Sequence, residues 1–335
     1  DDWKKYKLNR DISISIIPQM TNNSSEIATQ IEYDLDTSIL IQSNISKKVF
    51  FNNVDNPLSL KDLKKIKSFT RKNLKSNIDV ACFPVGAASE YPQCFLNINR
   101  KKEKNLVIKN SLSKLKLKLK IINPKVFFDA GGTYLISGKY SALNKYIAQP
   151  SYVQIKRYLK KENYQTLHIQ GGRKISYKHG QWLQEKMKYI DFKIKKNKII
   201  KAYSKKNYYY TNKDREIKLH DINKMYYESY INYKKKLLNI PIKSSWTLEF
   251  YIYHNLIIDF QGNINLKKSK LLKKYKLNHN IQNTGSSKKK YSVLKCHLDF
   301  NLFYGLLRRK YIWNIALSGS LILYERQPNK FDPNQ

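Results

Sequence analysis

The chain has 335 residues, which indicates about two domains, and 41% of them are hydrophobic and 13% aromatic. That content supports a sizeable core and excludes a wholly disordered chain. No apolar run reaches the ~18 residues of a membrane-spanning helix. Three cysteines without CxxC spacing argue against a disulfide framework or a cysteine-held metal cluster, so we expect a cytoplasmic protein. The start at Asp1 shows no signal peptide, and we expect a piece of a longer protein.

The formal net charge of +39 at pH 7 has two explanations. Lysines neutralise phosphates, so a nucleic-acid or anionic-membrane partner is the first. Codon bias is the second, because 55 of the 64 basic residues are lysines and Ile, Asn and Tyr, also encoded by AT-rich codons, are abundant. Arginine, the bidentate reader of bases and phosphates, is scarce. We therefore favour codon bias over a nucleic-acid partner.

The first half of the chain predicts strands followed by alternating helices and strands. Strict alternation over 11–17 predicts a strand, and two more are expected over 31–41 and 48–51. Ser59 is a suitable N-cap for a helix over 60–73. A short buried strand is expected over 78–84.

The segment 103–121 fits two periods. Its leucines alternate with lysines, as in a strand, but a spacing of three and four also puts four apolar residues on one helix face: Leu112, Leu115, Leu119 and Ile122. Lys and Leu form helices well, so we predict a helix that ends at Asn123-Pro124. A strand over 126–128 follows, which completes a layered α/β domain.

Three regions follow from these patterns. Residues 1–150 form an α/β domain, and residues 151–240 form a Lys- and Tyr-rich, mainly helical connection with a turn at Gly171-Gly172. Residues 241–335 form a small α+β region, in which alternation over 246–258 predicts a strand.

Metal-binding motifs are sparse. The six histidines lie at least eleven residues apart, so no HxHxDH, HExxH or His-x3-His pair exists. Asp55 follows the apolar strand 48–51, at the kind of strand end where ligand sites form in α/β proteins. It could ligate a metal held by histidines, or it could form an Asx-turn before Pro57. Spacing alone does not separate these two roles.

Two small-residue loops follow predicted strands, at Gly86 to Ser89 and at Ala130 to Thr133. Such loops let the backbone approach a ligand closely, and successive N–H groups bind anions. Neither loop matches a P-loop or dinucleotide motif, and tight packing is the alternative. We expect a substrate-binding set near these loops: Asn53, Gly86, Ser89, Gly131, Gly132 and Thr133.

Several short motifs carry a family resemblance through their order and spacing. They are Asp36 to Ile41, Asn53-Val54-Asp55, Gly86-Ala87-Ala88-Ser89 with Pro92, Asn123 to Val126, Ala130-Gly131, Leu306-Leu307, Trp313-Asn314, Gly319 and Tyr324 to Phe331. Together they resemble the metallo-β-lactamase-fold part of the CMP-N-acetylneuraminate hydroxylase family. The resemblance covers roughly 11–150 and 290–333.

The resemblance implies an α/β protein, the second half of a metallo-β-lactamase-type αββα sandwich with an α+β C-terminal extension. It matches Asp55 to the family's metal-ligating Asp and implies a divalent metal, iron or zinc, in the full-length protein. The family's Rieske-type domain and HxHxDH motif precede this region and are absent here. Ala130 stands where hydrolytic relatives often place a metal-binding His. The implied ligand set is therefore incomplete in this chain.

The implied function is that of a metalloenzyme of sialic acid metabolism that hydroxylates an anionic sugar or sugar nucleotide, with electrons from an iron–sulfur donor. Three alternatives stay open. One is a metal-dependent hydrolase of the same fold, and another is a metal-free descendant. The third is a non-enzymatic, basic RNA- or ribosome-associated protein, which a single continuous lysine face would favour over an even spread.

Overall fold

The computed structural model describes fourteen stretches of the chain: residues 3–18, 37–54, 56, 58–86, 89–130, 134–162, 164–169, 174–185, 192–208, 210, 219–237, 246–259, 262–279 and 292–329. The predicted site residues Asp55, Gly131, Gly132 and Thr133, and the predicted turn at Gly171-Gly172, lie outside the described residues.

The chain packs as two compact units. The first comprises residues 1–87, 106–133 and 149–189, and the second comprises residues 88–105, 134–148 and 190–335. Each unit therefore draws on segments far apart in the sequence. The predicted regions divide the chain by composition at 150 and 240, a division that stays a prediction.

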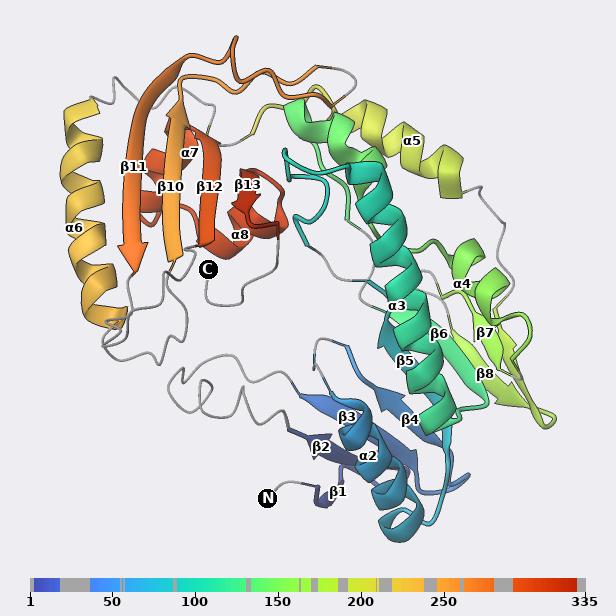
Figure 1. The fold of residues 1–335 in the computed structure, drawn as a ribbon. Helices are drawn as coiled ribbons and strands as arrows, with labels where there is room; N and C mark the ends of the chain where they lie inside the picture. The colour runs from blue at the N-terminus through green and yellow to red at the C-terminus, as the bar shows by residue number, and fades with distance from the viewer. Residues whose placement is uncertain are drawn as a thin grey trace. The chain divides into compact units, whose positions relative to one another are not determined.

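A seven-stranded sheet organises the first unit, with its strands in chain order (Figure 1). They are β1 (Lys5–Lys7), β2 (Ile12–Ile17), β3 (Ser38–Ser43), β4 (Val49–Asn52), β5 (Ile78–Pro84), β6 (Val126–Ala130) and β7 (Gln165–Leu167). The pairs from β1 to β4 are antiparallel, and those from β4 to β7 are parallel. Parallel pairs need crossover segments, which here contain helices.

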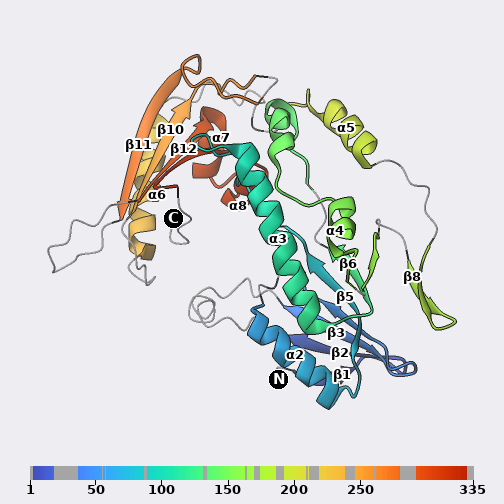
Figure 2. The same cartoon turned by 45° about the vertical axis from the view of Figure 1, so that its right-hand side comes forward.

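Three helices lie in those crossovers: α2 (Leu60–Asn73), α3 (Arg100–Ile122) and α4 (Tyr152–Leu159). Helices α2 and α3 cover the same face of the sheet in both views (Figures 1 and 2). Their apolar stripes pack with the buried side chains of that face, among them Leu40, Phe51 and Phe83. Helix α3 begins in the second unit and continues into the first.

Most predicted elements of the first unit are present. Helix α2 covers the predicted 60–73, and Ser59 forms a capping box with Asp62. Strand β5 covers the predicted 78–84. Of the two periods in 103–121, the helical one is confirmed: α3 buries the predicted apolar face, while Leu117 on another side is exposed.

Residues 165–184 differ from the helical prediction, because they form β7 and a hairpin of β8 (Ile175–Lys178) and β9 (Gln181–Gln184). Between the two strands, His179 and Gly180 both have positive φ, at 49° and 79°. Two such residues make the tight turn that matches the twist of a hairpin. The remainder of the region keeps the predicted helices as α4, α5 (Phe192–Tyr203) and α6 (Leu219–Leu237).

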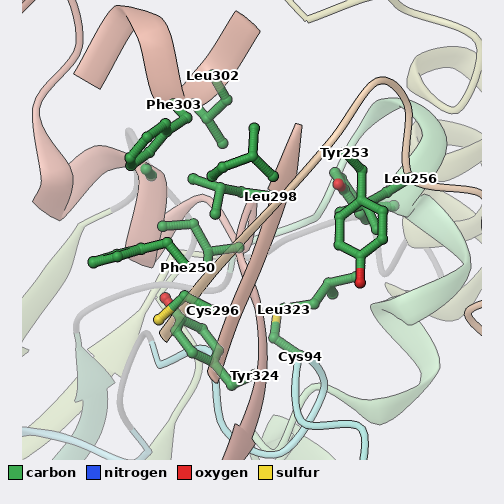
Figure 3. Packing of buried hydrophobic residues seen from close by; sticks show 14 of the residues in the cluster. Cys94, Phe250, Tyr253, Leu256, Cys296, Leu298, Leu302, Phe303, Leu323 and Tyr324 are labelled. Carbon is green, nitrogen blue, oxygen red and sulfur yellow. The ribbon is translucent and has the colours of Figure 1, made fainter. Parts of the chain in front are cut away.

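The second unit contains a four-stranded sheet in the order β11-β10-β12-β13. The bounds are β10 (Trp246–Tyr253), β11 (Leu271–His279), β12 (Ser292–Asp299) and β13 (Leu323–Gln327). Helices α7 (Phe300–Leu307) and α8 (Trp313–Ser318) connect β12 to β13, and the earlier segment η1 (Gly138–Tyr146) belongs to the same unit. Figure 3 shows the core around β10, β12 and α7, where Phe250, Leu298 and Phe303 meet. Strand β10 confirms the predicted strand, whereas β11 was not predicted from the sequence.

The chain is thus a mixed α/β protein, as predicted. All three cysteines are buried free thiols. Among the described helices, none has the length and apolarity needed to cross a membrane.

Candidate functional site

The carboxyl ends of the parallel strands β4, β5 and β6 bring polar groups together. Asn52 ends β4 and pairs across the sheet with Cys82 of β5, which pairs in turn with Phe128 of β6. The Asn52 Oδ1 accepts the Val54 N–H at 3.1 Å and the Cys82 thiol at 3.1 Å. Ligands of α/β proteins bind outside such strand ends, so this edge is the candidate site.

Asn53 is fully buried beside this edge. Its Nδ2 donates to Ser38 Oγ at 2.9 Å and to the Asn56 carbonyl at 2.8 Å, and its backbone N–H donates to the Cys82 carbonyl at 3.1 Å. These bonds fix the loop that carries Asp55. The structure therefore places Asn53 as a positioning residue of the loop, with its substrate contact still a prediction.

Asp129 is a member of this edge that sequence reasoning missed. It lies opposite Phe83 near the end of β6, and its Oδ1 accepts the Val85 N–H at 3.1 Å. Burial raises the pKa of its carboxyl from 3.8 to about 7, against the lowering effect of the Val85 hydrogen bond. A carboxyl group that titrates near neutrality can accept or donate a proton at physiological pH.

A signal for Asp129 was present in the sequence. It follows the apolar run Val126-Phe127-Phe128, just as Asp55 follows the strand over 48–51. The same strand-end rule that selected Asp55 selects Asp129.

Cys82 is not a nucleophile in this arrangement. Burial raises the pKa of its thiol to about 12, and only the thiolate attacks efficiently. Its place at the edge is that of a hydrogen-bond donor to Asn52.

Gly86 and Ser89 fall in different units. Gly86, just past β5, has a φ of +102°, and a Cβ there would lie 3.3 Å from side-chain atoms of Gln149 and Pro150. Conformation and packing together explain the glycine. In the second unit, the Ser89 carbonyl accepts hydrogen bonds from Gln93 and from the Tyr134 hydroxyl, the latter at 2.6 Å. The substrate-binding role of both residues stays a prediction.

The described residues do not form a complete metal site. No three His, Cys, Asp or Glu side chains among them come together as ligands. The buried side-chain oxygens of Asn53 and Asn56, on either side of Asp55, have no hydrogen-bond partner among these residues. Iron and zinc sites are built mainly from imidazole, thiolate and carboxylate groups, which two amide oxygens do not replace. The residues present therefore do not fit the implied iron or zinc.

Comparisons with known proteins add little to this description of a mixed α/β protein with polar groups at its strand ends. No family model matches it, and no curated protein matches it. Among solved structures, the CmlA beta-hydroxylase E377D mutant aligns with a TM-score of 0.30 at 10% identity, over 51% of this chain and 32% of that chain. The chain thus spans about a third of that protein. A likeness of this extent transfers neither fold nor function.

Proposed function

We propose that the first unit is one half of a two-sheet, metallo-β-lactamase-type scaffold whose active site includes the carboxyl ends of β4, β5 and β6. The full enzyme would act on a sugar nucleotide or surface-sugar precursor, as the family resemblance implies. The ligands of its metal would come from a segment outside these 335 residues, because the described residues do not form a metal site. A single observation carries the proposal: the face of the seven-stranded sheet opposite α2 and α3 is apolar, and among the described residues its β2 end is exposed.

Cross-strand register shows which side chains share that face. Ile14 pairs with Ile41, and Ile41 pairs with Phe50. A second row joins Ile16 to Ile39. Side chains of paired residues point to the same side of a sheet, so these five share a face. Helices α2 and α3 pack on the other face, against Leu40 and Phe51.

Coverage of the apolar face differs along the sheet. At β5 to β7, Val80, Val126 and Leu167 are buried with Ile175 and Trp182 of the β8–β9 hairpin. At β2, Ile12 is 38% exposed and Ile16 is 43% exposed. Soluble proteins rarely leave such a contiguous apolar patch open, and patches of this kind mark interfaces.

A second β-sheet is the occupant that this surface fits. A sheet with an apolar inner face packs about 10 Å from another such sheet and interdigitates with it. Rows of isoleucine on antiparallel strands are the side chains that such a layer buries. The candidate site then lies at the rim of the interface, where loops of both sheets meet.

Chemistry at this edge is limited to what these residues supply. Asp129, with its pKa near 7, can take or give a proton at neutral pH. Asn52 and Asn53 hold the loop after β4 in place through their hydrogen bonds.

Thiol labelling of the intact gene product tests the second sheet. Because Cys82, Cys94 and Cys296 are buried, an introduced cysteine reports its own access. We expect a maleimide to label Ile16→Cys at least tenfold more slowly than Ile45→Cys, whose native side chain is 75% exposed in a turn. Equal rates would overturn the two-sheet scaffold. A concentration-dependent rate would assign the face to a second copy of the chain and would also overturn it.

A further inference from the structure

Basic side chains line a hollow between α2 and α3 in the first unit. A cavity of about 490 Å³ is bounded by Lys64, Lys67, Ser68, Arg71, Lys72, Lys120 and Ile121. A neighbouring hollow of about 530 Å³ shares Arg71 and Lys72 and continues to Lys75, Ser76 and Asn77. We call the two together the α2–α3 groove. No carboxylate is among the described residues that line it.

The cations of α2 form a stripe along one side of the helix. Lys64, Lys67 and Arg71 follow one another at intervals of three and four residues within α2, which places them on the same side. Like charges at this spacing repel one another and destabilise a helix. The arrangement thus has an electrostatic cost that a bound anion would remove.

The close spacing of positive charges affects individual side chains of the groove. Burial, and then the charge of Arg71, lower the pKa of Lys67. The Arg71 Nε donates to Asn77 Oδ1 at 3.1 Å, which keeps the guanidinium at the groove. The helix dipole explains cations in the last turn, such as Arg71 and Lys72, but it does not explain Lys64 and Lys67 further from the C-terminus.

We propose that the α2–α3 groove binds the phosphodiester backbone of a single-stranded nucleic acid without reading its bases. From Lys64 to Lys72 the helical rise gives a length of about 12 Å, room for on the order of three phosphates of one strand. No aromatic side chain is among its described lining residues, so bases have no surface to stack on. The inference stands apart from the proposed function.

Fluorescence anisotropy with a labelled twelve-nucleotide poly(U) RNA tests the groove in the full chain. The groove variant is K64Q/K67Q/R71Q/K72Q/K120Q. The control variant, K267Q/K268Q/K270Q/K273Q/K276Q, removes five exposed charges from the second unit. At 0.1 M salt we expect the groove variant to lose at least tenfold in affinity and the control less than threefold. The slope of log K against log salt should become shallower by about 3 in the groove variant.

Conservative replacement separates charge from fold. Arg71→Lys keeps the charge, so RNA affinity should stay within about twofold of the wild type. Equal losses in the groove and control variants would show that net charge alone binds RNA, and would overturn the proposal. Binding to phosphatidylserine vesicles or to inorganic phosphate, with none to RNA, would overturn it as well. Thermal unfolding of each variant confirms that a loss of binding is not a loss of fold.

Discussion

At the scale of single residues, two groups with shifted pKa values that change charge between pH 4 and 8 lie in different units and respond to pH in opposite senses. Asp129 is a carboxyl group kept neutral by burial, and His297 is an imidazole kept neutral by burial. Burial keeps the acid neutral by raising its pKa and keeps the base neutral by lowering its pKa. The free energy of unfolding therefore falls with rising pH because of Asp129 and falls with falling pH because of His297.

Asp129→Asn should stabilise the protein above neutral pH. The unfolded carboxyl ionises near pH 3.8 and the folded one near 7, so wild-type stability from this group falls as pH rises between these values. Asparagine does not titrate and still accepts the Val85 N–H. We expect the unfolding free energy of the variant to exceed that of the wild type by about 2–3 kcal/mol at pH 8, from a three-unit shift reduced for solvent screening.

Urea unfolding at pH 4 and pH 8 measures this difference. At pH 4 the carboxyl of the folded wild type is protonated and the two proteins should unfold alike. A difference of equal size at both pH values would show that Asp129 is not protonated in the folded state.

His297→Gln should remove an acid sensitivity of the second unit. The His297 Nδ1 lies 3.1 Å from the Tyr253 hydroxyl, and its Nε2 lies 3.4 Å from Glu325. Burial lowers its pKa from 6.5 to about 4, although Glu325 opposes the shift. As pH falls from about 6.5 to 4, the unfolded imidazole gains a proton that the folded one does not, and stability is lost, by up to about 3 kcal/mol.

The measurement is the slope of unfolding free energy against pH between 4 and 6.5. His254→Gln, at an exposed position, is the matched control. We expect the slope to flatten in His297→Gln and to remain in His254→Gln. Equal slopes in the wild type and His297→Gln would mean that His297 takes up its proton while the protein is folded.

At the scale of elements, the capping box of α2 gives a local prediction. The Ser59 Oγ accepts the Asp62 N–H at 3.2 Å, and the Asp62 carboxylate accepts the Ser59 N–H at 3.2 Å. Ser59→Ala removes the first bond and should cost about 1 kcal/mol. Ser68→Ala, the same change at an exposed position inside α2, should instead stabilise by a few tenths because alanine favours helix interiors.

Chemical denaturation of the two variants compares these opposite effects. Destabilisation of equal size in both would assign the loss to the removed hydroxyl in general and not to the cap.

Helix α2 was predictable because its signals are local. A capping serine, an acidic first turn and a periodic apolar stripe all lie within the segment itself. In β2, the strand is equally evident from alternation, but its burial is not. Ser13, Ser15 and Ile17 are buried, while Ile12 and Ile16 are exposed, because the serines lie on the helix-covered side of the sheet. Which face is covered depends on distant segments that periodicity does not contain.

The candidate site was predictable in part for the same reason. The strand-end rule finds Asp55 and Asp129, yet the shifted pKa of Asp129 depends on its burial beside β5. The division of Gly86 and Ser89 between two units follows from packing and leaves no trace in a four-residue segment. Likewise, β8 and β9 stayed hidden because a Lys- and Tyr-rich sequence gives helix and strand similar support, and only the His179-Gly180 turn marks them.

At the scale of the whole molecule, the charge of +39 and the apolar sheet face have opposite effects on association with other surfaces. Net charge of one sign keeps a protein soluble but repels itself in the compact state. The apolar face around Ile14, Ile16 and Ile41 has the contrary tendency, since it gains from being covered. In the proposed two-sheet scaffold, the net charge would oppose non-specific association while the apolar face packs against a second sheet.

Ile16→Lys distinguishes a covered face from an open one in the intact gene product. Under a second sheet, the variant loses the burial of an isoleucine, about 1.5–3 kcal/mol, and places an ammonium group in an apolar layer, so we expect a total cost above about 3 kcal/mol. Ile45→Lys, in the exposed turn between β3 and β4, should change stability by less than about 0.5 kcal/mol. Urea unfolding measures both variants. Equal, small effects would show that the isoleucine face meets solvent, and the two-sheet scaffold would then be rejected together with the active site assigned to its rim.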